Sequence, residues 1–69
     1  MYKIEIPNVT NIATCQNLKE VYNALLDSQC MSNGTIHSVL EIADSLIEHG
    51  SYVGTVAYDK RYSYVIKKI

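Results

Sequence analysis

Residues 35–50, TIHSVLEIADSLIEHG, form the clearest pattern in the chain and decide its fold class. Apolar residues recur there at helical spacing: Ile36, Val39, Leu40, Ala43, Leu46 and Ile47. At 100° per residue they share one broad stripe, and the far side of the helix is polar. The residues on that far side are His37, Glu41, Asp44 and Glu48. With Thr35 as a suitable N-cap and Gly50 after the last turn, the pattern predicts an amphipathic helix with an acidic face.

Two β-rich runs follow this helix, at 51–58 and 61–69, and Asp59–Lys60 between them predicts a hairpin. The length of the turn decides which face of the hairpin is buried, because a shift of one residue exchanges the two faces. A two-residue loop brings together Val53, Ala57, Tyr62, Tyr64 and Ile66. A three-residue loop brings together Tyr52, Val56, Tyr58, Tyr62, Tyr64 and Ile66, and we favour this register.

Before this helix in the chain, the sequence predicts a first helix and one strand, so that the helix described above is the second. The predicted helix has its apolar face at helical spacing: Leu18, Val21, Tyr22, Leu25 and Leu26. Residues 2–6 alternate in the manner of a half-buried strand that Pro7 ends, and residues 8–13 are expected to form a loop. The fold expected for residues 1–69 is therefore a single small α+β domain of order β-α-α-β-β. Its three-stranded antiparallel sheet carries both helices on one face, and the first strand pairs with the last.

Length and composition indicate the cell compartment in which the protein is expected. The chain has 69 residues and a net charge of −1, with no apolar run long enough for a signal or a membrane span. Its two cysteines, Cys15 and Cys30, bracket the first helix, whose ends lie roughly 20 Å apart at 1.5 Å per residue. Because a disulfide needs Cα atoms within about 7 Å, we expect two free thiols in a cytoplasmic protein without membrane contact.

The acidic face of the second helix, His37, Glu41, Asp44 and Glu48, is the first candidate site. His37 and Glu41 are one turn apart, which suits two metal ligands, but no second ligand cluster accompanies them. We therefore expect no metal and no cofactor. The remaining interpretations are an ordinary solvated helix face and a contact surface for a basic protein partner.

A second candidate site lies in the C-terminal run, where basic residues alternate with tyrosines. The basic residues are Lys60, Arg61, Lys67 and Lys68. The basic side chains of such a pattern can contact phosphates, and its tyrosine rings can stack on nucleobases. The order helix, turn, helix, hairpin also resembles the later part of a winged helix-turn-helix domain, with 46–68 in place of its wing. That resemblance implies nucleic-acid binding. The helix that would enter the major groove, however, carries Glu41, Asp44 and Glu48 and no lysine or arginine.

Motifs for catalysis are absent from the sequence, which has no Gly-rich phosphate loop, no Cys-x-x-Cys and no Gly-x-Ser-x-Gly. We therefore expect a non-enzymatic small binding protein that acts through protein–protein contact with its acidic helix face. A small accessory protein from a phage or mobile element, inhibiting a host enzyme or defence complex, is the specific hypothesis. The alternative is a small winged-helix-like nucleic-acid-binding protein that uses the basic hairpin, and a homodimer is also open.

Overall fold

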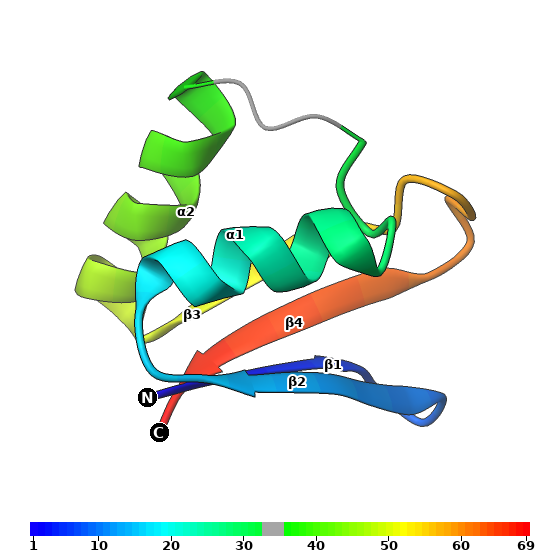
Figure 1. Cartoon of the computed structure of the whole chain (residues 1–69), viewed down its shortest axis with the longest axis horizontal. Coiled ribbons are helices and arrows are strands. Elements are labelled where there is room, and N and C mark those ends of the chain that lie inside the picture. Colours follow the sequence, from blue (N-terminus) through cyan, green and yellow to red (C-terminus); the bar gives the residue numbers. More distant parts are fainter. Residues whose placement is uncertain (33–35) are drawn as a thin grey trace.

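The computed structural model describes residues 1–32 and 36–69, and the side chains of these residues except 36–38. Four strands and two helices follow one another along the chain (Figure 1): β1 (Tyr2–Ile6), β2 (Thr10–Cys15), α1 (Leu18–Asp27), α2 (Ile36–His49), β3 (Ser51–Thr55) and β4 (Ser63–Lys68). The coarse class, α+β with an antiparallel sheet, is as predicted. The expected N-cap Thr35 and the side chain of His37 lie outside the described part of the chain.

The sheet has the strand order β2-β1-β4-β3, and every neighbouring pair is antiparallel. The predicted pairing of the first strand with the last is confirmed, since Tyr2 pairs with Lys68 and Ile4 with Ile66. In the view of Figure 1 both helices lie above β1 and β2, and β3 passes behind α1. α1 packs against β1 and β2, whereas α2 packs against β3 and β4.

The predicted loop over residues 8–13 is wrong, because most of that segment belongs to strand β2. Pro7 ends β1, but it also occupies the second position of a tight turn in which the Val9 N–H donates to the Ile6 carbonyl at 3.0 Å. Asn8 adopts a φ of 65° after it, which is typical of a type II turn. The chain therefore returns as a second strand. The order of elements along the chain is ββααββ, and the sheet has four strands instead of three.

The hairpin of β3 and β4 buries the face that we favoured, but its register is shifted by two residues from that of a three-residue loop, because the connection is longer. Tyr52 pairs with Ile66, and the inward face of the hairpin includes Val56 and Tyr64. The ordered strands are shorter than predicted, however, and residues 56–62 form the connection. Tyr58 and Tyr62 are exposed on that connection and do not join the core.

Capping groups mark both ends of α1 and the C-terminal end of α2. Asn17 caps α1, since its side-chain oxygen accepts from the Glu20 N–H at 3.0 Å. Gln29 ends the same helix with a φ of 61°, the left-handed conformation that is common just after a helix. Gly50 ends α2 as predicted: its φ is 71° and its N–H donates to the Leu46 carbonyl at 3.1 Å.

One core lies between the helices and the sheet. Its buried members are Ile4, Ile6, Cys15, Val21, Leu25, Cys30, Ile42, Leu46, Val56, Tyr64 and Ile66. Both thiols are buried and free, as the length of the intervening helix predicted. Burial raises the pKa of the Cys15 thiol, with a further contribution from Glu20, so this thiol stays protonated. The cysteines act here as small apolar side chains of the core.

Candidate functional site

Helix α2 presents the predicted acidic residues to solvent. Glu41, Asp44 and Glu48 are all exposed, on the side of the helix opposite the buried Ile42 and Leu46. The Glu48 carboxylate lies 3.6 Å from the His49 imidazole, and both side chains are open to water. The side chain of His37, the fourth predicted member, is outside the described part. The helix therefore brings three carboxylates to one exposed side.

The same exposed side carries two large aliphatic residues that the sequence pattern placed in the core. Leu40 is 56% exposed and Ile47 is 79% exposed, whereas Ile42, which the pattern omitted, is 1% exposed. Helix α2 is thus rotated about its axis relative to the predicted orientation. Residues 40 and 47 are seven apart, two turns along one side, with Asp44 between them. The exposed side of α2 is consequently both acidic and apolar.

Two hydrogen bonds fix this orientation of α2. The Tyr22 hydroxyl of α1 donates to the Val39 carbonyl at 2.9 Å. On the other side of the helix, the Ser45 hydroxyl donates to the Ser51 carbonyl of β3 at 2.7 Å. Because the two bonds hold opposite flanks of α2, they oppose a rotation that would bury Ile47.

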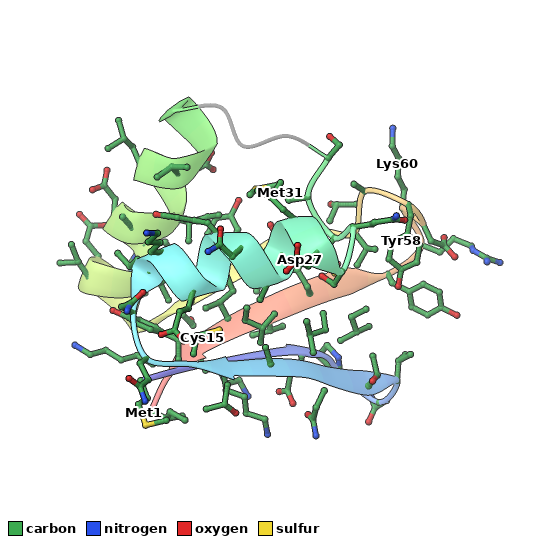
Figure 2. All side chains as sticks on the ribbon, in the orientation of Figure 1. Met1, Cys15, Asp27, Met31, Tyr58 and Lys60 are labelled. Atoms are coloured by element: carbon green, nitrogen blue, oxygen red, sulfur yellow. The ribbon has the colours of Figure 1, made fainter. Side chains whose placement is uncertain are left out.

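The four predicted basic residues do not form one patch. Lys60 and Arg61 lie in the connection before β4, while Lys67 and Lys68 lie at the other end of that strand, next to the chain termini (Figure 1). Figure 2 shows Lys60 and Tyr58 projecting from the end of the molecule that is opposite Met1. Of the hairpin that resembled a wing, the second strand, β4, is an interior strand of the sheet, between β1 and β3.

Two of these four bases are also held in ion pairs. Arg61 donates from Nε and Nη2 to the two oxygens of Asp59, at 3.0 and 2.8 Å, which lowers the pKa of the Asp59 carboxyl. Lys67 Nζ lies 3.5 Å from Glu5, which Lys3 also approaches at 3.5 Å. Intramolecular carboxylates therefore offset part of the positive charge that the sequence offered to phosphates.

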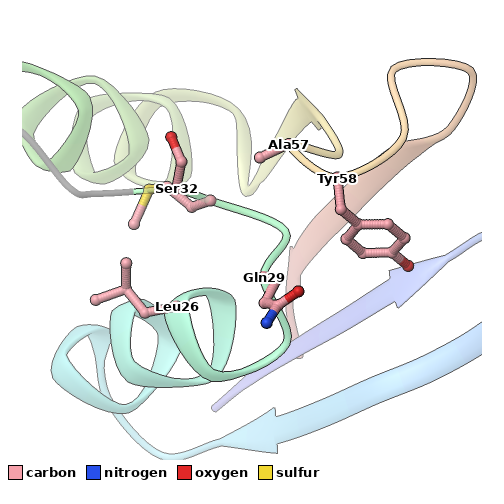
Figure 3. Close-up of a pocket in the computed structure, with 6 residues that line it drawn as sticks. Leu26, Gln29, Ser32, Ala57 and Tyr58 are labelled. Carbon is pink, nitrogen blue, oxygen red and sulfur yellow. The ribbon is translucent and has the colours of Figure 1, made fainter.

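A hollow of about 500 Å³ lies at the C-terminal end of α1, and the sequence pattern did not predict it. Figure 3 shows it between α1, the segment that follows the helix and the start of the connection after β3. Leu26, Gln29, Met31, Ser32, Ala57 and Tyr58 line it. Because no ionisable group besides the Tyr58 hydroxyl is in this lining, the hollow suits an apolar contact better than acid–base chemistry.

A smaller hollow of about 230 Å³ lies beside β3, where Tyr52 and Tyr64 meet. The two ring centroids are 6.2 Å apart, and Gly54 of β3 makes room for the Tyr64 ring. Burial raises the pKa of Tyr64 to about 12, with smaller contributions from Tyr52, Cys30 and Glu41. Burial and Glu41 raise the pKa of Tyr52 as well. Glu41 therefore lies near this pair.

The raised pKa of Tyr64 predicts a loss of stability at alkaline pH. Tyrosine in an unfolded chain ionises near pH 10, whereas the folded state retains the Tyr64 proton up to about pH 12. Between these values the unfolded state binds fewer protons, so the free energy of unfolding falls as the pH rises. We expect the melting temperature to drop from pH 10 to 12, and the drop to be smaller in Tyr64→Phe. An equal drop in both proteins would contradict this assignment.

Metal ligands do not cluster in the described part of the chain, where no group of three His, Cys, Asp or Glu residues could hold an ion. Neither of the described helices is long and apolar enough to cross a membrane. No family model matches the sequence, and searches of the curated proteins and of the solved structures also found no match.

Proposed function

We propose that this chain is a non-enzymatic binding protein that recognises another protein through the exposed side of α2. The observation that carries the proposal is the composition of that side, where Glu41, Asp44 and Glu48 accompany the exposed Leu40 and Ile47. A merely solvated helix face needs no pair of large aliphatic residues. Aliphatic side chains next to charged ones are instead the usual make-up of a protein interface, with an apolar centre and a polar rim.

The carboxylates indicate a partner with a basic surface. Charges at the rim of an interface steer association and exclude partners of like charge, and their effect falls with added salt. A surface that otherwise binds nucleic acid has the required charge. The specific form of the proposal is therefore inhibition of a nucleic-acid-binding host enzyme or defence complex by a phage or mobile-element protein. The basic hairpin supports the nucleic-acid alternative less well, because its bases are divided between two ends of β4.

The test is capture from cell lysate, with and without nuclease treatment, by the wild type and by the triple variant Glu41→Lys, Asp44→Lys, Glu48→Lys. We expect the triple variant to retain less than about a tenth of the captured protein, while its melting temperature stays within a few degrees, because exposed like charges contribute only tenths of a kcal/mol. Asp44→Lys and Asp27→Lys form a matched pair, since both replace an exposed helical acid. Only Asp44→Lys should weaken capture.

Two outcomes would contradict the proposal. Full capture by the triple variant would mean that the exposed side of α2 is only solvated. Recovery of nucleic acid alone, lost after nuclease treatment and weakened by replacing Lys60 and Lys68 with glutamine, would favour the nucleic-acid-binding alternative.

A further inference from the structure

The outer edge of β3 is the less protected edge of the sheet. β3 pairs with β4 on one side only, and no strand of the described residues pairs with its other side. Its sequence, SYVGT, has no charge and no proline. The opposite edge strand, β2, has a bulge at Ile12, because Ile4 pairs with Ala13 while Glu5 pairs with Asn11. Charges, prolines and bulges are the usual devices that block strand addition, and β3 lacks all three.

Backbone hydrogen bonds define which groups of β3 face outward. The Val56 N–H donates to the Tyr62 carbonyl at 3.0 Å, and the Gly50 carbonyl accepts from Lys68 at 2.9 Å. Because this direction alternates along a strand, the N–H and C=O groups of Ser51, Val53 and Thr55 point away from β4. They form a row that an added strand can pair with.

The two ends of this row are already occupied. The Ser51 carbonyl accepts from the Ser45 hydroxyl at 2.7 Å. The Ala57 N–H, the next outward donor after Thr55, donates to the Cys30 carbonyl at 2.8 Å. Among the described residues, no backbone group bonds to the outward groups of Val53 and Thr55 between them. The site therefore suits a short extended segment.

The smaller hollow described above lies alongside this row. Thr55, Gly54 and Tyr52 of β3 contribute to its lining, together with Ile42 of α2 and Tyr64 of β4. A strand added to β3 alternates its side chains between the helix layer and the open face of the sheet. The hollow gives room for the side chains that point toward the helix layer. On the open face of the sheet, Val53 is 62% exposed and offers an apolar neighbour to the side chains of the added strand that point to that face.

The charge beside this edge selects the occupant. Ser45 reaches the outward Ser51 carbonyl, so its side of α2 faces the outer edge of β3. Glu41 and Glu48 are four residues before and three residues after Ser45, and therefore lie on the same side of the helix. A second copy of the chain, pairing β3 with β3, would bring its own carboxylates toward these two. A strand with lysine or arginine side chains would meet them favourably.

We propose that the outer edge of β3 binds an extended, basic segment of a partner protein as an additional strand of the sheet. Backbone hydrogen bonds to Val53 and Thr55 hold the segment, and its basic side chains reach Glu41 and Glu48. The inference rests on the proposed function, because it specifies how the partner of the α2 side engages the chain. It adds a sheet edge to a contact surface that so far consisted of one helix.

The first test measures binding of a synthetic peptide of about seven residues, alternating lysine and valine, to the full chain by fluorescence anisotropy. We expect it to bind at least about tenfold more tightly than the matched glutamate–valine peptide. Val53→Pro removes one outward N–H and leaves the bonds to β4 intact, so it should weaken binding about tenfold. Val53→Ala keeps the N–H and should change binding by no more than about twofold. Absence of peptide binding at millimolar concentration, or full binding by Val53→Pro, overturns the inference.

A second pair of variants does not depend on proline being tolerated in β3. The double variant Glu41→Gln, Glu48→Gln should bind the lysine–valine peptide about tenfold more weakly than the wild type. The distant Asp27→Asn should not weaken binding. Equal effects of the two would overturn the inference. Sedimentation that shows a doubled mass, abolished by Val53→Pro, would assign the edge to a second copy instead. If the triple α2 variant loses protein capture while Val53→Pro retains it, the proposed function stands and strand addition is wrong.

Discussion

Replacing Ile42 with alanine should leave much of the protein unfolded at room temperature, whereas the same replacement at Ile47 should be almost neutral. Ile42 is 1% exposed in the shared core and Ile47 is 79% exposed, although both lie on α2. Truncating a buried isoleucine costs about 2–5 kcal/mol, through lost burial and the cavity left behind. An exposed site changes by about 0.5 kcal/mol at most, and alanine also favours the helix slightly.

This pair of variants tests the rotation of α2 directly, because chemistry and helix are the same in both. A chain of 69 residues has only a few kcal/mol of stability to lose, so the expected cost at Ile42 is comparable with the whole. Urea denaturation followed by circular dichroism measures both free energies of unfolding. Similar losses for the two variants would mean that α2 has the orientation expected from the sequence pattern.

The sequence predicted the existence and type of α2 well, and its rotation poorly. Besides the six residues of the predicted stripe, Ile42 is apolar, so the apolar positions span roughly 160°, almost half of the helix circumference. Such a pattern fits several directions of the core equally. The actual direction depends on contacts far apart in the sequence, namely Tyr22 with the Val39 carbonyl and Ser45 with the Ser51 carbonyl. Periodicity alone does not contain this information.

Strand β2 escaped prediction for a different reason. The alternation of apolar and polar residues that marks a strand is interrupted at Ile12, where a bulge adds one residue to β2. The signal that could have revealed it is local: Pro7–Asn8 is a favourable centre for a type II turn, and such a turn returns the chain antiparallel to β1. We interpreted Pro7 only as the end of a strand.

The candidate site was predicted in part. The exposure of Glu41, Asp44 and Glu48 followed from the helical pattern, because charged residues are rarely buried without a partner. The aliphatic members Leu40 and Ile47 did not follow, since their exposure depends on the rotation of α2. The free edge of β3 depends on the strand order, which sequence patterns specify weakly.

Gly54 is required by the close approach of the Tyr64 ring across the β3–β4 pair. The two residues are directly paired, and the tyrosine side chain lies over the glycine. A Cβ atom at position 54 would stand 2.8 Å from Cε1 of Tyr64, and closer still to its Cζ and Oη atoms. Tyr64 is itself buried and packs against Tyr52, so any shift of its ring would disturb that packing.

Gly54→Ala should therefore destabilise the protein, although alanine normally stabilises a strand relative to glycine by about 0.5–1 kcal/mol. Overpacking of this kind costs about 1–3 kcal/mol, which in a domain of this size lowers the melting temperature by roughly 5–20 °C. The same substitution made in a Tyr64→Val background removes the ring that the Cβ meets. There alanine should be neutral or stabilising relative to glycine, and the difference between the two backgrounds is the coupling free energy of the pair. Loss of stability of equal size in both backgrounds would locate the cost in the backbone of β3, and the Tyr64 ring would then not be the reason for glycine at this position.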